Sequence, residues 1–278
     1  MQLFKTIKNN SSLVNILYTN ILVFIVINFL YAIGFLLEKE FGIIHYLGVP
    51  ANLETLCKRP WTIISYMFVH IDFLHLFVNL FWLYFGGKIF IQYLSQKQLL
   101  STYMMGGVLG AIIYIIAFNV FPAFDNTKEY SLAIGASASV LAILFAIASY
   151  VPNYSINITL LGSIKLKHIA IMALIIDIVS IPKGNAGGHI AHIGGALYGY
   201  IYILMLKRSI NTNYLIEQVM TLLSLSPTIQ YKKYENDYEY NARKRNEEKK
   251  IDEILEKISR SGYDSLSNEE KETLFKHK

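Results

Sequence analysis

The sequence predicts an all-α membrane protein, a polytopic bundle of six transmembrane helices with a small helical C-terminal appendix on the cytosolic side. Hydrophobic residues make up 54% of the 278-residue chain and charged residues only 16%, whereas soluble domains carry about 25% charged residues. The charged residues are sparse before Ile210 and dense after Tyr231. A polar tail therefore follows a core that is embedded in lipid.

Six apolar stretches approach the roughly 20 residues that a helix needs to cross a hydrocarbon core of about 30 Å. The last three are shorter or interrupted, which indicates that they do not all cross as simple straight helices. The six stretches lie at about residues 14–37, 61–87, 99–121, 132–151, 169–181 and 187–206.

The distribution of basic residues favours a location of both termini in the cytoplasm. Six spans place the termini on one side, and Lys and Arg are in excess in the loops of that side and in the tail. Such flanking residues also explain the net charge of +5, so no nucleic acid partner is implied. The polar N-terminal segment MQLFKTIKNNSS lacks the pattern of a removable signal peptide. We therefore expect a multi-pass protein of a prokaryotic cell (inner) membrane.

The longest loop between spans covers residues 38–60 and is followed by Trp61. Indole rings favour the interface between membrane and water, so this loop is expected to lie partly in that interface. The single cysteine, Cys57, excludes an internal disulfide framework.

The chain divides into a transmembrane core over residues 1–208, a polar linker over 209–246 and a small helical appendix over 247–278. In the appendix, Ser267 and Glu270 have the spacing of a helix capping box. The appendix could bind a cytosolic partner or could be a solvated cap. Four apolar residues share one face of its first predicted helix: Ile251, Ile254, Leu255 and Ile258.

Polar side chains inside a membrane need a partner or a function, because a central charge costs about 2.5–3.5 kcal/mol on insertion scales. His75 and Asn79 lie four residues apart and so share one helix face. As an isolated pair they could equally hold two helices together by hydrogen bonds. The polar candidates within the predicted spans are His70, His75, Asn79, Ser137, Ser139, Asp177, His189 and His192.

Three of these residues are predicted to lie at one depth. His75, Ser137 and His192 precede the inner ends of their spans by 13 to 15 residues. At about 1.5 Å per residue these counts correspond to rises of roughly 20–22 Å. All three side chains would then lie about 8–10 Å below the outer face of the hydrocarbon core. Residues that serve only packing have no reason to share a depth.

Glycines around these residues indicate how they could meet. Gly135 precedes Ser137 by two residues, and a helix that begins there is too short to cross the core. The chain above it must be irregular backbone, which is tolerated where it lines a water-filled cavity or is buried in protein. Gly195 and Gly199 are four residues apart, a spacing that lets another helix approach to backbone contact. If that neighbour is the fourth span, His192 can reach the hydroxyl of Ser137.

A serine beside a histidine is the arrangement of a nucleophile and its base. The negative charge that develops on a carbonyl under attack needs hydrogen-bond donors, and losing one costs about 10²–10³ in rate. His75, Asn79 and the backbone N–H of Ser137 can supply them. Of the acidic residues only Asp72 and Asp177 could lie near this level, and nothing in the sequence directs either to His192. We therefore expect a dyad and not a triad.

The segments HIDFLHLFVN, GAS and AHIGGALYG together resemble the signature of the rhomboid family of intramembrane serine proteases. The resemblance implies a six-helix core, a Ser–His dyad, no cofactor and a site open to the extracytoplasmic side. It implies that a transmembrane segment of another membrane protein is cleaved near its outer end, through an acyl-enzyme. Ser137 would be the nucleophile, and His192 the general base and later the acid. His75, Asn79 and the Ser137 backbone N–H would form the oxyanion hole.

Three positions depart from common patterns of the family. Thr62 follows Trp61 where many members have arginine, which affects how the first loop is anchored. Ala138 follows the serine where many have glycine, which affects the width of the pocket. Leu141 stands where many have an aromatic residue against the histidine ring, which affects how His192 is held.

Alternative interpretations remain for the other polar residues. His70 could polarise the pocket, although a structural hydrogen bond is favoured. His189 with His70 and His75 could suggest a metal site, but the chain has no HExxH motif or cysteine cluster, and no metal is predicted. Asp177 could relay protons, but a hydrogen bond between helices or to a loop is favoured. The alternative functions are an inactive rhomboid-like binder of membrane helices and an ion-coupled transporter that uses Asp177 and the histidines.

Overall fold

A computed structural model describes residues 11–158 and 162–222, together with residues 254, 257–258, 265–267 and 270. The chain divides into two compact units, Met1–Tyr231 and Lys232–Lys278. Helices dominate the described part, which confirms the helical class predicted from the sequence, although two small two-stranded sheets are also present.

Six longer helices overlap the six predicted apolar stretches, although residues 61–72 of the second stretch precede its helix, which extends to Tyr93. Four of them, α2, α6, α7 and α10, are long and apolar enough to cross a membrane, whereas α8 and α9 have only 14 and 15 residues. Within the described ranges, four helices rather than six therefore meet the requirement for a span. The six are α2 (Ser12–Leu36), α6 (Phe73–Tyr93), α7 (Gln96–Val120), α8 (Ser137–Tyr150), α9 (Leu166–Ser180) and α10 (Ala186–Lys207).

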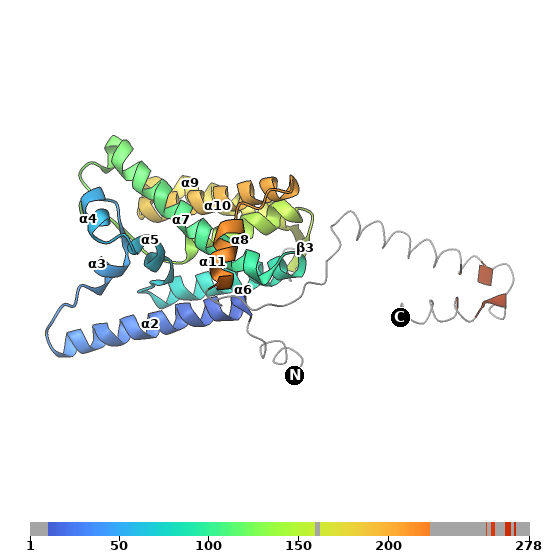
Figure 1. Cartoon of the computed structure of the whole chain (residues 1–278), viewed down its shortest axis with the longest axis horizontal. Helices are drawn as coiled ribbons and strands as arrows, with labels where there is room; N and C mark the ends of the chain where they lie inside the picture. The colour runs from blue at the N-terminus through green and yellow to red at the C-terminus, as the bar shows by residue number, and fades with distance from the viewer. Residues whose placement is uncertain are drawn as a thin grey trace. The chain divides into compact units, whose positions relative to one another are not determined.

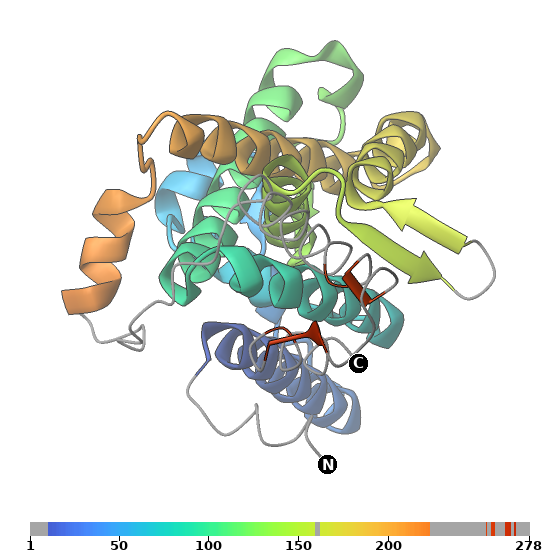
Figure 2. The ribbon, with the colours of Figure 1, turned by 90° about the vertical axis from the view of Figure 1, so that its right-hand side faces the viewer.

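Helix α8 is the centre of the bundle. It lies among α6, α7 and α10 (Figures 1 and 2), with α9 against one side. Most of its residues are buried, and many of them are alanine or serine. Such small side chains let neighbouring helices approach closely in a lipid environment, where packing replaces the hydrophobic effect as the force between helices. The central helix is thus also the shortest of the six.

Glycines of the neighbouring helices provide the closest contacts with α8. A Cβ atom at Gly195 of α10 would collide with the carbonyl oxygen of Ala138, and one at Gly199 would collide with that of Ala142. The close approach predicted from the four-residue spacing is therefore present, and the fourth apolar stretch is the neighbour.

The first loop is folded rather than extended. Strand β1 pairs antiparallel with β2 (Leu132–Ala133), the segment that leads into α8, and Val49 lies opposite Ala133. The loop is therefore tied to the irregular backbone above Ser137. Its elements are α3 (Ile43–Leu47), β1 (Val49–Pro50), α4 (Leu53–Lys58), α5 (Thr62–Ser65) and the 3₁₀ helix η2 (Tyr66–Phe68).

Two side chains at the end of this loop anchor it. The Trp61 Nε1–H donates to the carbonyl oxygen of Tyr46 at 2.8 Å. Arg59 donates to the carbonyl oxygen of His45 at 2.6 Å, and its guanidinium lies 4.4 Å from the centre of the Tyr46 ring. An arginine two residues before Trp61 thus anchors the loop in this chain, where Thr62 replaces the arginine that is common after the tryptophan.

Capping explains where α7 begins. The Ser95 hydroxyl accepts the Gln98 backbone N–H, and the Gln98 side-chain oxygen accepts the Ser95 backbone N–H, both at 2.9 Å. This reciprocal pair satisfies two donors that a helix N-terminus leaves open.

The segment predicted as a polar linker from residue 209 contains a helix, α11 (Tyr214–Leu222). Buried Asn213 just before it donates to the Thr102 hydroxyl at 3.2 Å, and Glu217 accepts from Ser101 at 3.3 Å. Both partners lie on α7. The linker prediction missed this helix, whose contacts with α7 are polar and whose apolar residues Leu215, Val219 and Leu222 are exposed. The remaining elements are the 3₁₀ helices η3 (Pro122–Phe124) and η4 (Ile181–Lys183) and the hairpin of β3 (Ser155–Ile158) and β4 (Gly162–Lys165).

In the second unit, the capping box predicted at Ser267 and Glu270 is present. The Ser267 N–H donates to the Glu270 carboxylate at 2.7 Å, and the Glu270 N–H donates to the Ser267 hydroxyl at 3.2 Å. Ile254, one of the predicted apolar face, is buried. Ile251 and Leu255 of that face lie outside the described residues.

We predict that Gly199→Ala destabilises the protein. Alanine is favoured over glycine in a helix by about 0.8–1.0 kcal/mol, but the new methyl group would collide with the Ala142 carbonyl oxygen. Overpacking of this kind typically costs about 1–3 kcal/mol, so the thermal unfolding midpoint in detergent should fall. Leu197→Ala, at an exposed position of the same helix, is the control. An unchanged or higher midpoint for Gly199→Ala would contradict the assigned packing.

Candidate active site

Ser137 is the first residue of α8, and the backbone before it turns sharply. Gly135 has a φ of +117°, and a side chain there would lie within 2.7 Å of the His75 ring. The backbone N–H of Gly135 donates to the carbonyl oxygen of Tyr66 at 2.9 Å. Glycine is thus required for both conformation and space. The N–H of Ser137 belongs to the first turn of α8, where backbone N–H groups have no partner within the helix.

His70 supports the same turn from outside the pocket. Its ring is fully buried, and its Nε2 accepts the backbone N–H of Ala136 at 3.3 Å. Of the two roles considered from the sequence, the structure therefore favours a structural hydrogen bond. Ser139 is also fully buried, with its hydroxyl 3.8 Å from the sulfur of Met67.

His192 reaches Ser137 from α10. Its Nε2 lies 2.5 Å from the Ser137 hydroxyl oxygen, although the two residues are 55 positions apart in the sequence. The contact is possible because Gly195, one turn further along α10, lets that helix touch the backbone of α8. The structure therefore brings together the serine and the histidine that the shared depth predicted.

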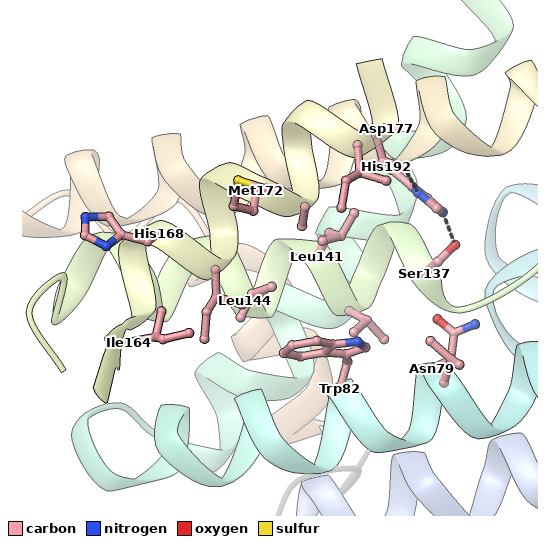
Figure 3. A pocket seen from close by; sticks show the side chains of 15 residues that line it. Asn79, Trp82, Ser137, Leu141, Leu144, Ile164, His168, Met172, Asp177 and His192 are labelled. Carbon is pink, nitrogen blue, oxygen red and sulfur yellow. Dashed lines mark hydrogen bonds and ion pairs between the residues drawn. The ribbon is translucent and has the colours of Figure 1, made fainter. Parts of the chain in front are cut away.

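Asp177 occupies the other side of the His192 ring. Its Oδ1 lies 2.7 Å from His192 Nδ1 and 2.8 Å from His189 Nδ1, and only 8% of its side chain is exposed. Figure 3 shows the interactions in line from Asp177 through His192 to Ser137. The expectation that no acidic residue is directed at His192 is therefore wrong. Helix α9 ends just before a short turn, and α10 returns alongside it.

The sequence held one signal for this contact. Asp177 precedes Gly184 by seven residues and His192 follows it by eight. In two antiparallel helices joined by a tight turn, residues that are nearly equidistant from the turn lie opposite each other. Using that signal requires the place of the turn, which the short apolar stretch of the fifth span left open.

His75 and Asn79 approach the site from α6. His75 is in the first turn of α6, and its ring lies against Gly135. Asn79 is 95% buried, lines the pocket below Ser137 (Figure 3) and donates one N–H to its own helix, to the carbonyl oxygen of His75 at 2.9 Å. A side-chain amide has two N–H donors, so one is left to face the pocket.

A cavity of about 550 Å³ joins these polar groups to an apolar groove between α6, α8 and α9. Asn79, Ser137, Asp177 and His192 lie at one end and His168 at the opposite end (Figure 3), and aliphatic and aromatic side chains line the space between them. Leu141 is part of this lining. The apolar side chains that form it are Val78, Trp82, Val140, Leu141, Leu144, Ile164, Ile169, Met172, Ala173 and Ile176.

Asp177, His189 and His192 together carry the ligand atoms of a possible metal site. One ligand atom each of Asp177, His189 and His192 lies within 4.8 Å of the other two, and two histidines with a carboxylate suit zinc. However, the hydrogen bonds of 2.7 and 2.8 Å already pair both imidazoles with the carboxylate. The predicted absence of a metal accordingly stays a prediction.

Models of two known protein families match this chain. The rhomboid domain model matches residues 58–209, and a family of unknown function, DUF6576, matches residues 234–277. The first match covers α6 to α10 and all the site residues described above.

Similar curated proteins include a presenilin-associated rhomboid-like protein A of Danio rerio, which is 30% identical over 168 residues, 59% of this chain and 41% of that protein. The RHOMBOID-like protein 12 of Arabidopsis thaliana is 27% identical over 147 residues, 50% of this chain and 44% of that protein. The presenilin-associated rhomboid-like protein of Bos taurus is 26% identical over 139 residues, 49% of this chain and 35% of that protein. The matches thus cover less than half the length of these relatives.

These comparisons correct the predicted location. The names of all three relatives describe them as mitochondrial proteins, and they come from animals and a plant. The expectation of a prokaryotic cell membrane with both termini in the cytoplasm is therefore wrong.

We predict that chelation leaves the protein unchanged, because hydrogen bonds account for the ligand atoms of Asp177, His189 and His192. Dialysis against EDTA should not lower the thermal unfolding midpoint, and elemental analysis should find metal well below one ion per chain. A bound ion stabilises the folded state that holds it. One metal per chain, with a lower midpoint after chelation, would contradict this prediction.

Proposed function

The chain belongs to the rhomboid family, and from this premise we propose that it is an intramembrane serine endopeptidase that cleaves transmembrane segments of other membrane proteins. The observation that carries the proposal is the contact of 2.5 Å between His192 Nε2 and the Ser137 hydroxyl. Two polar residues of different membrane helices meet there at the end of an apolar groove. A hydroxyl needs such a base to become a nucleophile.

The first step is acylation of the serine. His192 Nε2 removes the proton of the Ser137 hydroxyl while the Oγ attacks the carbonyl carbon of the scissile peptide bond. The carbonyl oxygen then carries a negative charge in the tetrahedral intermediate. The imidazolium returns its proton to the amide nitrogen, the C–N bond breaks, and the amine leaves. The serine is left as an ester of the substrate's N-terminal part.

The second step is hydrolysis of that ester. Water gives a proton to His192 Nε2 and attacks the ester carbonyl, and collapse of the second tetrahedral intermediate returns the proton to Ser137 Oγ. The apolar groove does not itself supply water, so water enters from the end of the bundle at which α6, α8 and α10 begin. The polar residues of the site lie at that end.

Three donors are suited to the oxyanion. The N–H of Ser137 lies at the N-terminus of α8, where the helix dipole also favours an anion. The second amide N–H of Asn79 faces the pocket, and the ring of His75 lies beside Gly135. Donors that are fixed before the reaction need no reorganisation when charge develops.

The groove determines the class of substrate. Its lining is almost entirely apolar, and it runs between α6 and α9 away from Ser137. An apolar segment of another membrane protein fits this lining, whereas a polar peptide would lose its hydration there. Cleavage would fall near the end of that segment, at the level of Ser137. Enzyme and substrate would both be embedded in the lipid bilayer.

The alternative functions are not favoured. An inactive binder of membrane helices needs neither a serine nor a histidine, yet both are present and in contact. An ion-coupled transporter would require a carboxylate that can exchange a proton or bind an ion. Asp177 instead accepts hydrogen bonds from two histidines.

We predict that Ser137→Ala and His192→Ala each reduce cleavage of a single-span reporter protein in detergent by at least about 10³-fold, since removing either group of such a pair disables the whole unit. The matched control is Ser139→Ala, which removes a buried hydroxyl two residues further along the same helix. Cleavage at the wild-type rate by Ser137→Ala or His192→Ala, with folding intact, would overturn the proposed function.

We predict that Asn79→Ala lowers kcat by about 10²–10³ with little change in KM, as expected for the loss of one oxyanion donor. Asn28→Ala in α2 is the control. Asn28 makes the same bond to the carbonyl oxygen four residues earlier, at 3.0 Å, but lies outside the pocket. Equal kinetics for both variants would remove Asn79 from the oxyanion hole and leave the other donors.

A further inference from the structure

We infer that Asp177 and His189 are positioning residues that hold the imidazole of His192 in the tautomer and orientation it needs to accept the proton of Ser137. This inference rests on the proposed function. The relevant contacts form one continuous series from Ser137 to His192, Asp177 and His189, with distances of 2.5, 2.7 and 2.8 Å. The series extends the dyad by two residues.

The tautomer follows from the chemistry of the carboxylate. An ionised carboxylate only accepts hydrogen bonds, and a neutral imidazole carries one proton. The proton of His192 therefore lies on Nδ1, which faces Asp177, and Nε2 is left with a lone pair directed at the Ser137 hydroxyl. Without the carboxylate the ring could carry its proton on Nε2, where it would be unable to act as a base. The carboxylate also stabilises the imidazolium that forms when His192 takes the proton.

Leu141 offers the His192 ring no hydrogen bond or aromatic contact. Family members commonly hold the histidine ring against an aromatic side chain four residues after the serine, and this chain has Leu141 there. A leucine can fill space in the pocket, but it offers neither an aromatic face nor a hydrogen bond to fix the ring. The hydrogen bond from His192 Nδ1 to Asp177 supplies that constraint by a different route.

His189 has a distinct task, which is to hold the carboxylate. Asp177 lies on a helix whose adjacent residues Ile176 and Ile178 are 58% and 51% exposed, as expected for a surface in contact with lipid. A carboxylate there is costly unless it is paired. The second bond, from His189 Nδ1 to the same oxygen, supplies a second donor and fixes the side chain towards α10. His189 therefore acts on His192 through Asp177.

The first experiment measures the kinetics of Asp177→Asn with a single-span reporter substrate in detergent. The variant keeps the size of the side chain but loses the charge, and we expect kcat to fall by up to about 10⁴-fold with little change in KM, the loss known for an orienting carboxylate in a Ser-His-Asp triad. The matched control is Asp125→Asn, which removes an exposed acidic group that lies outside the pocket. Its kcat should stay near that of the wild type.

The second experiment separates His189 from general packing. His189→Leu removes the donor and should lower kcat by about 10- to 100-fold, by analogy with the loss of a hydrogen-bond partner behind a metal-ligating histidine. His189→Gln keeps an N–H donor and should restore part of the loss. The double variant Asp177→Asn/His189→Leu should match Asp177→Asn alone, because residues that act in series are not additive.

The Asp177 and His189 variants test the positioning role, whereas the Ser137 variant tests the protease assignment, so failure of one can be told from failure of the other. If Asp177→Asn cleaves at the wild-type rate while Ser137→Ala is inactive, the positioning role is overturned and the protease assignment stands. If Ser137→Ala also cleaves, the proposed function itself fails. If Asp177→Asn does not fold, the His189 variants decide, and equal effects of Leu and Gln at that position would overturn the inference.

Discussion

The rest of the structure depends on the contact between the backbones of α8 and α10. At Gly195 and Gly199, α10 touches carbonyl oxygens of α8 that any side chain would push away. This contact puts the imidazole of His192 against the hydroxyl of Ser137. A membrane bundle has little hydrophobic driving force between its helices, so close packing of small residues takes that role. The two glycines therefore determine both the stability of the bundle and the geometry of the site.

The low polarity of the membrane explains why the polar groups are arranged in series. A buried polar side chain costs free energy unless it forms hydrogen bonds. Ser137, His192, Asp177 and His189 meet this requirement by bonding to one another across three helices. The same arrangement prepares a base beside a hydroxyl. The hydrogen bonds that satisfy these buried polar groups are thus the same ones that prepare the reaction. His70 likewise accepts the backbone N–H of Ala136, just before α8.

The residues that meet at the site were better predicted than their partner on α9. The count of residues to the expected inner ends of the spans predicted one level for His75, Ser137 and His192, and the structure brings Ser137 and His192 into contact. The count could not direct Asp177 to His192, since that depends on where the turn between α9 and α10 falls and how the helices are rotated about their axes. The sequence showed that Thr62 and Leu141 depart from the family pattern. It did not show which other residues take over the roles of the missing arginine and aromatic side chains. Arg59 anchors the first loop, and Asp177 holds the ring that Leu141 does not.

Covalent labelling tests the central claim most directly. The intact protein in detergent is treated with a fluorophosphonate, and the modified peptide is identified by mass spectrometry. A hydroxyl activated by a neighbouring imidazole should give a single adduct at Ser137, formed far more slowly in His192→Ala. No adduct at Ser137, or an equal rate of labelling with and without His192, would contradict the account.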